Sequence, residues 1–330
     1  MGIQTVLSDV QNVLAGANLD VRPPATGYDW EITDIGSSVW VGVAPNSRPQ
    51  VDIGYYDGLI GPSYVLRSTD VRGWFRPQRL SINRNNYLRF NNPGIAAENV
   101  SYSAKITRYY GTGLSGCISD LQTLIAGATY SVQPPAGYDY KVKDIGSDQW
   151  VGGAPAGLPN VRVDLTDGIF TAIILQGTDV RQWEDELEIF VNNTNYINIV
   201  NTAAVQGVIS FSADLHRYYG AGMSTVISDL QNCGAGASVD FQPANGVEWR
   251  ITGFAAANWV GVPPLQFPDV TINLYDGTIA SSLALQTDWK EQGHQMDIVV
   301  SDTDYIRITD TSGAGGDVGI IGELHQVFAS

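Results

Sequence analysis

Four acidic side chains lie close together in one segment of the chain, at Glu184, Asp185, Glu186 and Glu188. Two carboxyl groups that flank a glycosidic bond form the catalytic pair of most glycoside hydrolases. This cluster leaves open a hydrolase of cell-surface polymers, with Glu184 and Glu186 as its acid pair. We favour a solvated strand edge, because charged edges discourage pairing between sheets of different molecules.

The three histidines, His216, His294 and His325, do not suggest a nucleophilic triad. His216 and His325 occupy matching positions 109 residues apart, so we expect exposed strand ends rather than a catalytic pair. The sequence also lacks a Gly-x-Ser-x-Gly elbow, a phosphate-binding loop, a dinucleotide fingerprint and a His-Glu-x-x-His helix. We therefore predict that the protein is not an enzyme, with no catalytic residues and no cofactor.

Two groups of residues could hold a metal ion by type alone. The first offers carboxylate oxygens, which suit calcium: Asp297, Asp302, Asp304 and Asp310. Their spacing does not match an EF-hand loop, so we expect an acidic, solvated turn. The second is the pair Cys117, which we expect in a linker, and Cys233, and two thiols are too few for a zinc site. We expect buried or incidental thiols and no metal site.

The same short phrases recur three times along the chain. Trp-Val-Gly begins at Trp40, Trp150 and Trp259, and Asp-Gly begins at Asp57, Asp167 and Asp276. A period of about 110 residues is too long for a solenoid unit and has the size of one small domain. We therefore predict three tandem domains with bounds 1–111, 112–220 and 221–330, called repeats one, two and three.

Within each repeat, apolar and polar residues alternate over short segments, as in half-buried β-strands. The segment 51–55 alternates Val, Ile and Tyr before an Asp-Gly, which is the strongest short hairpin signal. The opening segment 5–17 fits a helical turn or an extended arm. About eight short strands per repeat predict an all-β fold of three tandem antiparallel β-sandwich domains, jelly-roll-like and of about 110 residues each. Short glycine-rich linkers at 111–116 and 220–225 favour domains that lie close together.

Two sets of tryptophans could stack on sugars. Those of the Trp-Val-Gly phrase are better read as structural, at the rim of each core. The second set varies in placement among the repeats, so we expect it at the surface: Trp74, Trp183 and Trp289. These three are the glycan-binding candidates of an alternative function as a carbohydrate-binding module.

Charge is distributed unevenly over the repeats. The whole chain carries −16, which argues against nucleic acid as a partner. Repeat one is close to neutral and rich in arginine, whereas repeats two and three are acidic. Arginine is the cation preferred at interfaces, because its planar fork binds carboxylates in a bidentate way. The candidate docking residues for an acidic partner are Arg67, Arg72, Arg76, Arg79, Arg84 and Arg89.

The phrases VRPPATGYDWEITDIGSSVWVGVAP, VDIGYYDG and INRNNYLRFNN resemble the β-sandwich modules of virion structural proteins of tailed bacteriophages. The resemblance extends over each whole repeat. It implies a capsid decoration (cement) protein or a head fibre, located at the capsid surface. It also implies the major capsid protein or other virion proteins as partners. Such proteins are often trimers of one-domain chains, so three domains in one chain leave open a pseudo-trimer, a linear spike or a larger homo-oligomer.

Alternatives to this function are a receptor- or carbohydrate-binding module of a phage fibre or tail, and a bacterial surface adhesin. The N-terminal segment lacks the basic start and apolar stretch of a secretory signal, which weakens the adhesin. No apolar run is long enough for a membrane helix. We therefore expect synthesis in the host cytoplasm and no membrane partner.

Overall fold

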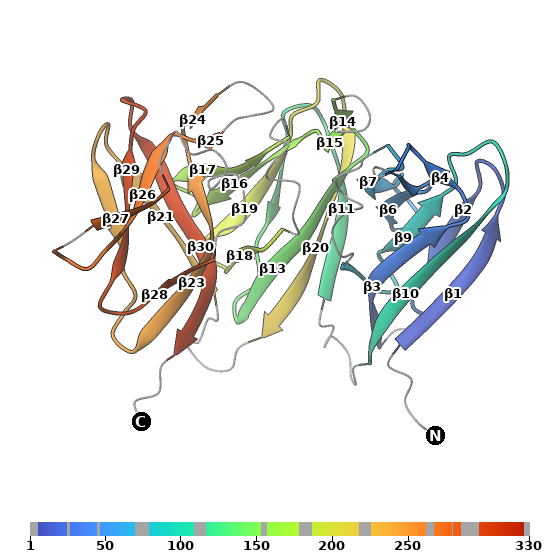
Figure 1. The fold of residues 1–330 in the computed structure, drawn as a ribbon, viewed down its shortest axis with the longest axis horizontal. Coiled ribbons are helices and arrows are strands. Elements are labelled where there is room, and N and C mark those ends of the chain that lie inside the picture. The colour runs from blue at the N-terminus through green and yellow to red at the C-terminus, as the bar shows by residue number, and fades with distance from the viewer. Residues whose placement is uncertain are drawn as a thin grey trace. The chain divides into compact units, whose positions relative to one another are not determined.

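The computed structural model describes residues 6–24, 27–44, 47–69, 79–108, 117–152, 157–177, 187–217, 226–261, 267–278, 280–284 and 297–326. Over these ranges every regular element is a β-strand (Figure 1). The described part of the chain therefore has no helix that could span a membrane. The predicted all-β class is confirmed.

Repeat one forms two four-stranded layers and a small ribbon. Its strands are β1 (Val6–Val13), β2 (Asn18–Val21), β3 (Tyr28–Ser37), β4 (Trp40–Val41), β5 (Arg48–Pro49), β6 (Asp52–Tyr56), β7 (Ser63–Leu66), β8 (Leu80–Ile82), β9 (Tyr87–Asn91) and β10 (Glu98–Arg108). One layer has the order β1-β10-β3-β8, and the other has the order β2-β9-β6-β7. β4 and β5 pair only with each other.

Repeats two and three contain the same series of strands. Those of repeat two are β11 (Cys117–Leu124), β12 (Thr129–Val132), β13 (Tyr138–Ser147), β14 (Trp150–Val151), β15 (Leu158–Pro159), β16 (Val161–Thr166), β17 (Thr171–Gln176), β18 (Ile189–Val191), β19 (Tyr196–Asn201) and β20 (Gly207–Arg217). Those of repeat three are β21 (Val226–Cys233), β22 (Ser238–Phe241), β23 (Val247–Ala256), β24 (Trp259–Val260), β25 (Phe267–Pro268), β26 (Val270–Tyr275), β27 (Ala280–Ala284), β28 (Ile298–Val300), β29 (Tyr305–Asp310) and β30 (Gly316–Gln326).

The order of the strands is that of a jelly roll. When the small ribbon is set aside, the first strand of a repeat pairs with its last, and the second pairs with the last but one. In repeat three, β21 likewise pairs with β30, and β22 pairs with β29. Two interleaved four-stranded antiparallel sheets with these pairings define the double Greek key. The prediction of jelly-roll sandwiches in tandem is confirmed.

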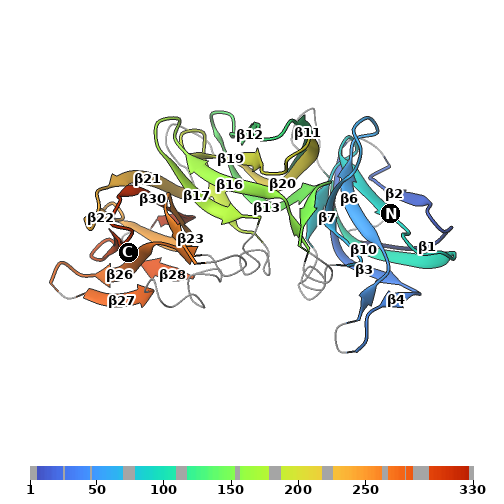
Figure 2. The ribbon, with the colours of Figure 1, turned by 90° about the horizontal axis from the view of Figure 1, so that it is seen from above.

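The recurrent Asp-Gly forms the turn of a β-hairpin. In each repeat it joins two antiparallel strands, β6 to β7, β16 to β17 and β26 to β27. Figure 2 shows β6 beside β7 and β26 beside β27. Gly58 has a φ of 90°, a backbone conformation that residues other than glycine rarely adopt. The Asp57 carboxylate accepts hydrogen bonds from the backbone N–H groups of Leu59 and Ile60, which fixes the turn.

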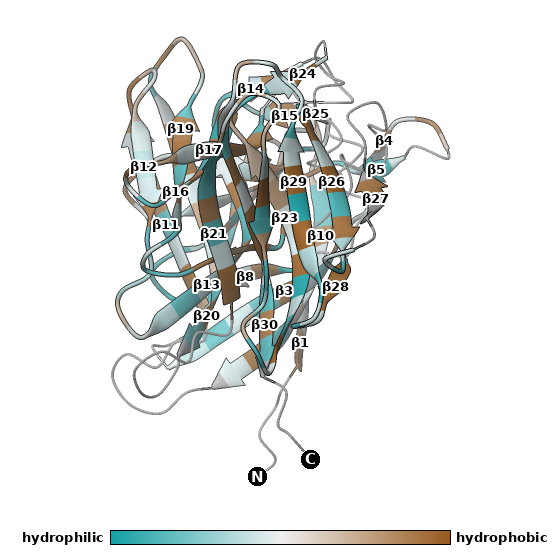
Figure 3. Ribbon diagram, turned by 90° about the vertical axis from the view of Figure 1, so that its left-hand side faces the viewer, coloured by the Kyte–Doolittle hydropathy of each residue, from teal (hydrophilic) through white to brown (hydrophobic). Residues whose placement is uncertain are grey.

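The predicted alternation of burial is clear on β29, where Ile306 and Ile308 are fully buried and their neighbours are half-buried. At 51–55 the apolar Val51, Ile53 and Tyr55 are fully buried, but the intervening Asp52 is buried too, so both faces of β6 are covered. Figure 3 shows hydrophobic and hydrophilic segments succeeding one another along strands such as β29 and β30. Burying a side chain of this size contributes about 1.5–3 kcal/mol, so these alternating rows supply most of the cohesion of a sandwich.

The opening segment of each repeat is a strand. This settles the choice between a helical turn and an extended arm that the sequence left open, because β1 pairs along its whole length with β10. It also corrects the placement of Cys117, which does not lie in a linker. Cys117 is the first residue of β11, and it and Cys233 are buried, as expected of the thiols.

The chain divides into two compact units. The first contains Met1–Ala128, Val142–Asn160 and Asn201–Leu215, and the second contains Thr129–Lys141, Val161–Val200 and His216–Ser330. Repeat one therefore shares a unit with β11 and most of β13 and β20, and repeat three shares a unit with β12, β16 to β18 and most of β19. The bounds 1–111, 112–220 and 221–330 stay a prediction, because the units follow packing rather than the sequence repeat.

Candidate functional site

The predicted docking arginines are only partly described. Arg72 and Arg76 lie outside the described residues. Arg67 stacks over the ring of Tyr64, with its guanidinium carbon 5.1 Å from the ring centre. Arg84 donates to the carbonyl of Pro23, and Arg79 is exposed just before β8. The role of these arginines in docking remains a prediction.

Arg89 has a structural partner that the sequence did not reveal. Its guanidinium forms a bidentate pair with the carboxylate of Asp20, at 2.7 and 2.9 Å, across the pair β2–β9. It also stacks 3.6 Å from the ring centre of Tyr56. Repeat three has the same arrangement, in which Arg307 binds Asp240 at 2.7 and 2.8 Å. The recurrence explains why an arginine stands at both positions without requiring a docking role.

Of the two sets of tryptophans, the structure describes the one in the Trp-Val-Gly phrase. Trp74, Trp183 and Trp289 all lie outside the described residues. The indole of Trp40 donates to the carbonyl of Ser37 at 3.0 Å, and Trp150 and Trp259 make the matching bond three residues back. One indole hydrogen bond repeated in three domains supports the structural interpretation of the Trp-Val-Gly phrase.

The acidic groups that the sequence singled out do not converge in the described part. Glu184, Asp185 and Glu186 lie outside it, and the side chain of Glu188 pairs with Lys141. Asp297 binds Arg250, whereas Asp302 accepts the N–H of Gly246. The described residues hold no group of three or more His, Cys, Asp or Glu side chains able to ligate a metal ion.

The main feature beyond the residues predicted above is how one repeat covers the next. Leu121, on the outer face of β11, belongs to the hydrophobic cluster of repeat one. The thiol of Cys117 lies 3.8 Å from the carbonyl oxygen of Ile82 at the end of β8. We call the outward side of the first strand of a repeat, together with the strands beside it, the covered face; on β11 it includes Cys117 and Leu121. We call the surface of the preceding repeat that lies over it the covering face. In repeat one the covering face is formed by the hairpin β6–β7, by β8 and by the turn after β8, and in repeats two and three by the matching strands.

The same hydrogen bond marks both junctions between repeats. The side-chain amide of Asn86 donates to the carbonyl of Ser119 on β11. The side-chain amide of Asn195 donates in the same way to the carbonyl of Ser228 on β21. Both pairs are 33 residues apart in sequence. Each junction lies within one unit, so the chain builds one docking geometry twice.

The sheets also continue across both junctions. Tyr64 on β7 pairs with Ser147 on β13. Ile173 on β17 pairs with Ala256 on β23, and these are the equivalent positions one repeat later. A strand edge that would otherwise expose its backbone groups is thereby partly closed in each repeat.

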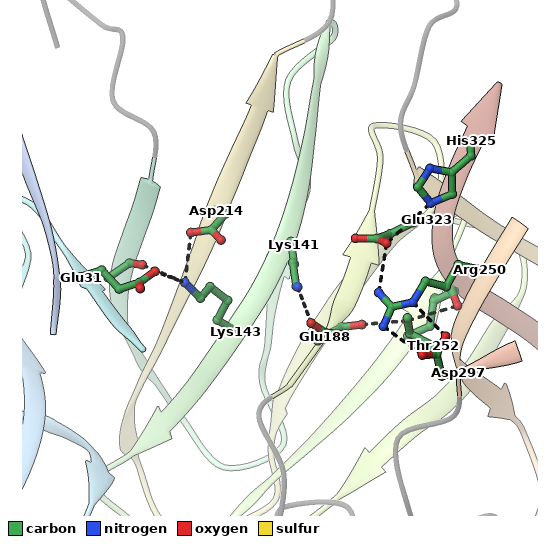
Figure 4. A network of polar contacts seen from close by, with 12 residues as sticks. Glu31, Lys141, Lys143, Glu188, Asp214, Arg250, Thr252, Asp297, Glu323 and His325 are labelled. Carbon is green, nitrogen blue, oxygen red and sulfur yellow. Dashed lines mark hydrogen bonds and ion pairs between the residues drawn. The ribbon is translucent and has the colours of Figure 1, made fainter. Parts of the chain in front are cut away.

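The first junction contains a buried charge. Lys143 on β13 has a side chain that is only 2% exposed, and its ammonium group lies 3.0 Å from Glu31 of repeat one and 3.3 Å from Asp214 (Figure 4). Burial alone would lower the pKa of Lys143, but Asp214 and Glu31 outweigh it and raise the pKa above its ordinary value. Burial raises the pKa of Glu31, yet the bond and charge of Lys143, with help from Lys105, bring it below its ordinary value. Both shifts favour the charged pair.

The second junction is more apolar. Thr252 stands at the position of Lys143 and donates to the carbonyl of Glu188 at 3.1 Å. Gly319 leaves room for Leu165, since a Cβ there would lie 3.0 Å from a methyl group of that leucine. The charges near Thr252 pair within their own repeats: Arg250 binds Asp297 and Glu323 in repeat three, and Glu188 pairs with Lys141 in repeat two (Figure 4). The two junctions thus share their geometry and differ in chemistry.

Comparison with known proteins does not assign the chain to a family. No protein-family model and no curated protein matches the chain. The chain is similar to the major capsid protein P2 from bacteriophage PM2, with 16% identity, 64% of this chain and 98% of that chain covered, and a TM-score of 0.25. It is also similar to a structure described as the triple jelly roll fold and turret assembly in an archaeal virus, with 10% identity, 98% and 90% covered, and a TM-score of 0.22. Both scores are low, so the jelly-roll assignment rests on strand order and not on these likenesses.

Proposed function

We propose that this chain is a non-enzymatic structural protein of a virion, which decorates the outer surface of a phage capsid and stabilises it. The observation that carries the proposal is the pair of equivalent junctions, which hold successive jelly rolls together through the covered and covering faces. A protein that reinforces a shell needs domains fixed to one another by buried contacts more than it needs a cleft.

The distribution of charge supports a docking end. Repeat one is nearly neutral and carries Arg79 exposed beside β8, whereas repeats two and three hold the acidic excess. Electrostatic complementarity with an acidic capsid surface would mainly set the register and the association rate. Binding to the assembled lattice in preference to free subunits would stabilise the shell by mass action.

Co-sedimentation with capsid-like particles stripped of accessory proteins tests this function. The wild-type chain should bind, and Arg72→Glu, Arg76→Glu and Arg79→Glu together should weaken binding by about tenfold or more, since the contact is electrostatic. Arg79→Glu alone is matched by Arg22→Glu, which reverses another exposed arginine of repeat one and should leave binding unchanged.

Binding that ignores the three arginine reversals would overturn docking through repeat one. The carbohydrate-binding alternative would be established instead by a chain that does not bind particles but binds glycans. That glycan binding should then be lost with Trp74→Ala, Trp183→Ala and Trp289→Ala.

A further inference from the structure

In the part of the chain that the structure describes, the covered face of repeat one is exposed. Val6 and Val10 on β1 are 61% and 65% exposed. The equivalent side chains on β11, Cys117 and Leu121, are 6% and 3% exposed. The same positions on β21 are equally buried, at Val226 with 3% and Leu230 with 6%.

The covering face of repeat three is open in a matching way. Val299 on β28 is 65% exposed, whereas Ser81 and Phe190 at the same position are 3% and 2% exposed. Leu274 and Leu283 on the hairpin β26–β27 are only half-buried. Their counterparts in repeats one and two are buried.

The strand edges repeat this pattern. Ser147 and Ala256, which pair with the preceding repeat, are each 1% exposed. Ser37 is the equivalent residue on β3, and it is half-buried. Ser282 on β27 occupies the position of Tyr64 and Ile173, and it is exposed. Among the described strands, one edge of each kind therefore lacks this pairing, at β3 of repeat one and at β27 of repeat three.

We infer that repeat three of one chain covers repeat one of a second copy, through a third version of the junction that the chain already builds twice. Val299 and the turn after β28 lie over Val6 and Val10 of the second copy, and β27 extends the sheet that contains β3. The interface joins two different faces, so it is heterologous and leads to a closed ring or an open filament. This inference rests on the chain's own junctions and is independent of capsid decoration.

The residues of the third junction predict a weaker contact than the two internal ones. Thr33 repeats Thr252, and its hydroxyl lies at the same 3.4 Å from the carbonyl of the neighbouring strand. Asp304, however, stands where Asn86 and Asn195 donate their amide hydrogen bonds. An ionised carboxylate cannot donate to the carbonyl of Ser8, so one bond of the junction is missing. We therefore expect association that is reversible and depends on concentration.

Sedimentation of the full chain over a range of concentrations tests the inference. The wild-type mass should rise above the 35.6 kDa of one chain. Val10→Asp on the covered face and Val299→Asp on the covering face should each weaken association by about tenfold or more, because each places a charge in an apolar contact. Both side chains are mostly exposed, so neither variant should fail to fold. Leu59→Asp, at a side chain that is 90% exposed in the β6–β7 turn, is the matched control and should associate like wild type.

Mixing the two variants tests the head-to-tail arrangement. Val10→Asp keeps its covering face, and Val299→Asp keeps its covered face. An equimolar mixture should form dimers of one chain of each kind and nothing larger. Asp304→Asn should restore the missing bond and tighten association by about threefold to tenfold.

Two results would overturn the inference. One is a wild-type chain whose mass remains at 35.6 kDa up to a concentration of about 1 mM, since the dissociation constant would then be weaker than about 1 mM. The other is an oligomer that survives both substitutions, or variants that fail to recombine, since the oligomer would then use other surfaces. Particle binding is not measured in this experiment, so its outcome is separate from that of the proposed function.

Discussion

The ammonium group of Lys143, on β13 of repeat two, lies 3.0 Å from the carboxylate of Glu31, on β3 of repeat one. The lysine side chain is almost fully buried, whereas that of Glu31 is 27% exposed. This asymmetry determines which partner the junction needs more. A buried charge left without its partner costs far more than a partly hydrated one.

Removing Glu31 should therefore destabilise the protein more than removing Lys143. Glu31→Ala should lower the free energy of unfolding by about 2–3 kcal/mol, since Lys143 then keeps only Asp214. Lys143→Met, which preserves the packing and leaves two partly exposed carboxylates, should cost about 1 kcal/mol or less. Urea denaturation measures both.

Lys105→Ala is the control for this comparison. Lys105 binds the same Glu31 carboxylate at 3.3 Å, but its side chain is 66% exposed. The cost should be below about 1 kcal/mol, as for surface ion pairs. The double variant Glu31→Ala with Lys143→Met should recover most of the loss of Glu31→Ala. Equal effects of Glu31→Ala and Lys105→Ala would show that the pair with Lys143 contributes nothing.

The contribution of this pair should depend on pH at both extremes. The pKa of Glu31 is lowered from 4.5 in the folded state, so its stabilisation is present above that value and is lost as the pH falls through the lowered pKa. The pKa of Lys143 is raised from 10.5, so its stabilisation is present below that value and is lost as the pH rises through the raised pKa.

Melting temperatures of wild type and Lys143→Met over pH check this behaviour. The difference between the two should be constant between about pH 5 and pH 10 and should shrink outside that window. Subtracting the variant removes the titration of groups far from the junction. A difference that keeps its size down to about pH 2 would contradict a stabilising role for the ionised Glu31.

The two junction asparagines should behave alike. Asn86→Ala and Asn195→Ala each remove one amide donor from a serine carbonyl on the next repeat, at a cost of about 1 kcal/mol. Asn85→Ala, one position earlier in an exposed turn, should cost little. Thermal unfolding measures all three. A loss at only one of the two asparagines would mean that the junctions are not equivalent.

The sequence predicted the fold better than the junctions. The alternation of apolar and polar residues along a strand and the Asp-Gly turns depend on local geometry, so the sequence alone predicts them, as at Ile306 and Ile308 on β29. The partners of Lys143 lie 112 and 71 positions away, and no local pattern connects them.

The first strand of each repeat carries one signal of the junctions in its sequence. On β1, Val6 and Val10 point away from the core while Leu7 packs against it, so both faces of the strand carry apolar residues. A strand that is apolar on both faces is covered on both, as buried strands generally are. The first strands of all three repeats have this feature, and the described residues form two internal junctions, which leaves the outer face of β1 to account for.

The reactivity of a thiol at the three equivalent strand positions tests the account most directly. Cys117 is the native thiol at this position in repeat two, and Val6→Cys and Val226→Cys place one in repeats one and three. In dilute solution, maleimide should label position 6 at least about a hundredfold faster than Cys117 or position 226, because the covered positions react only after local opening. Labelling at similar rates at all three positions would contradict the account, since it would mean that no repeat covers the next.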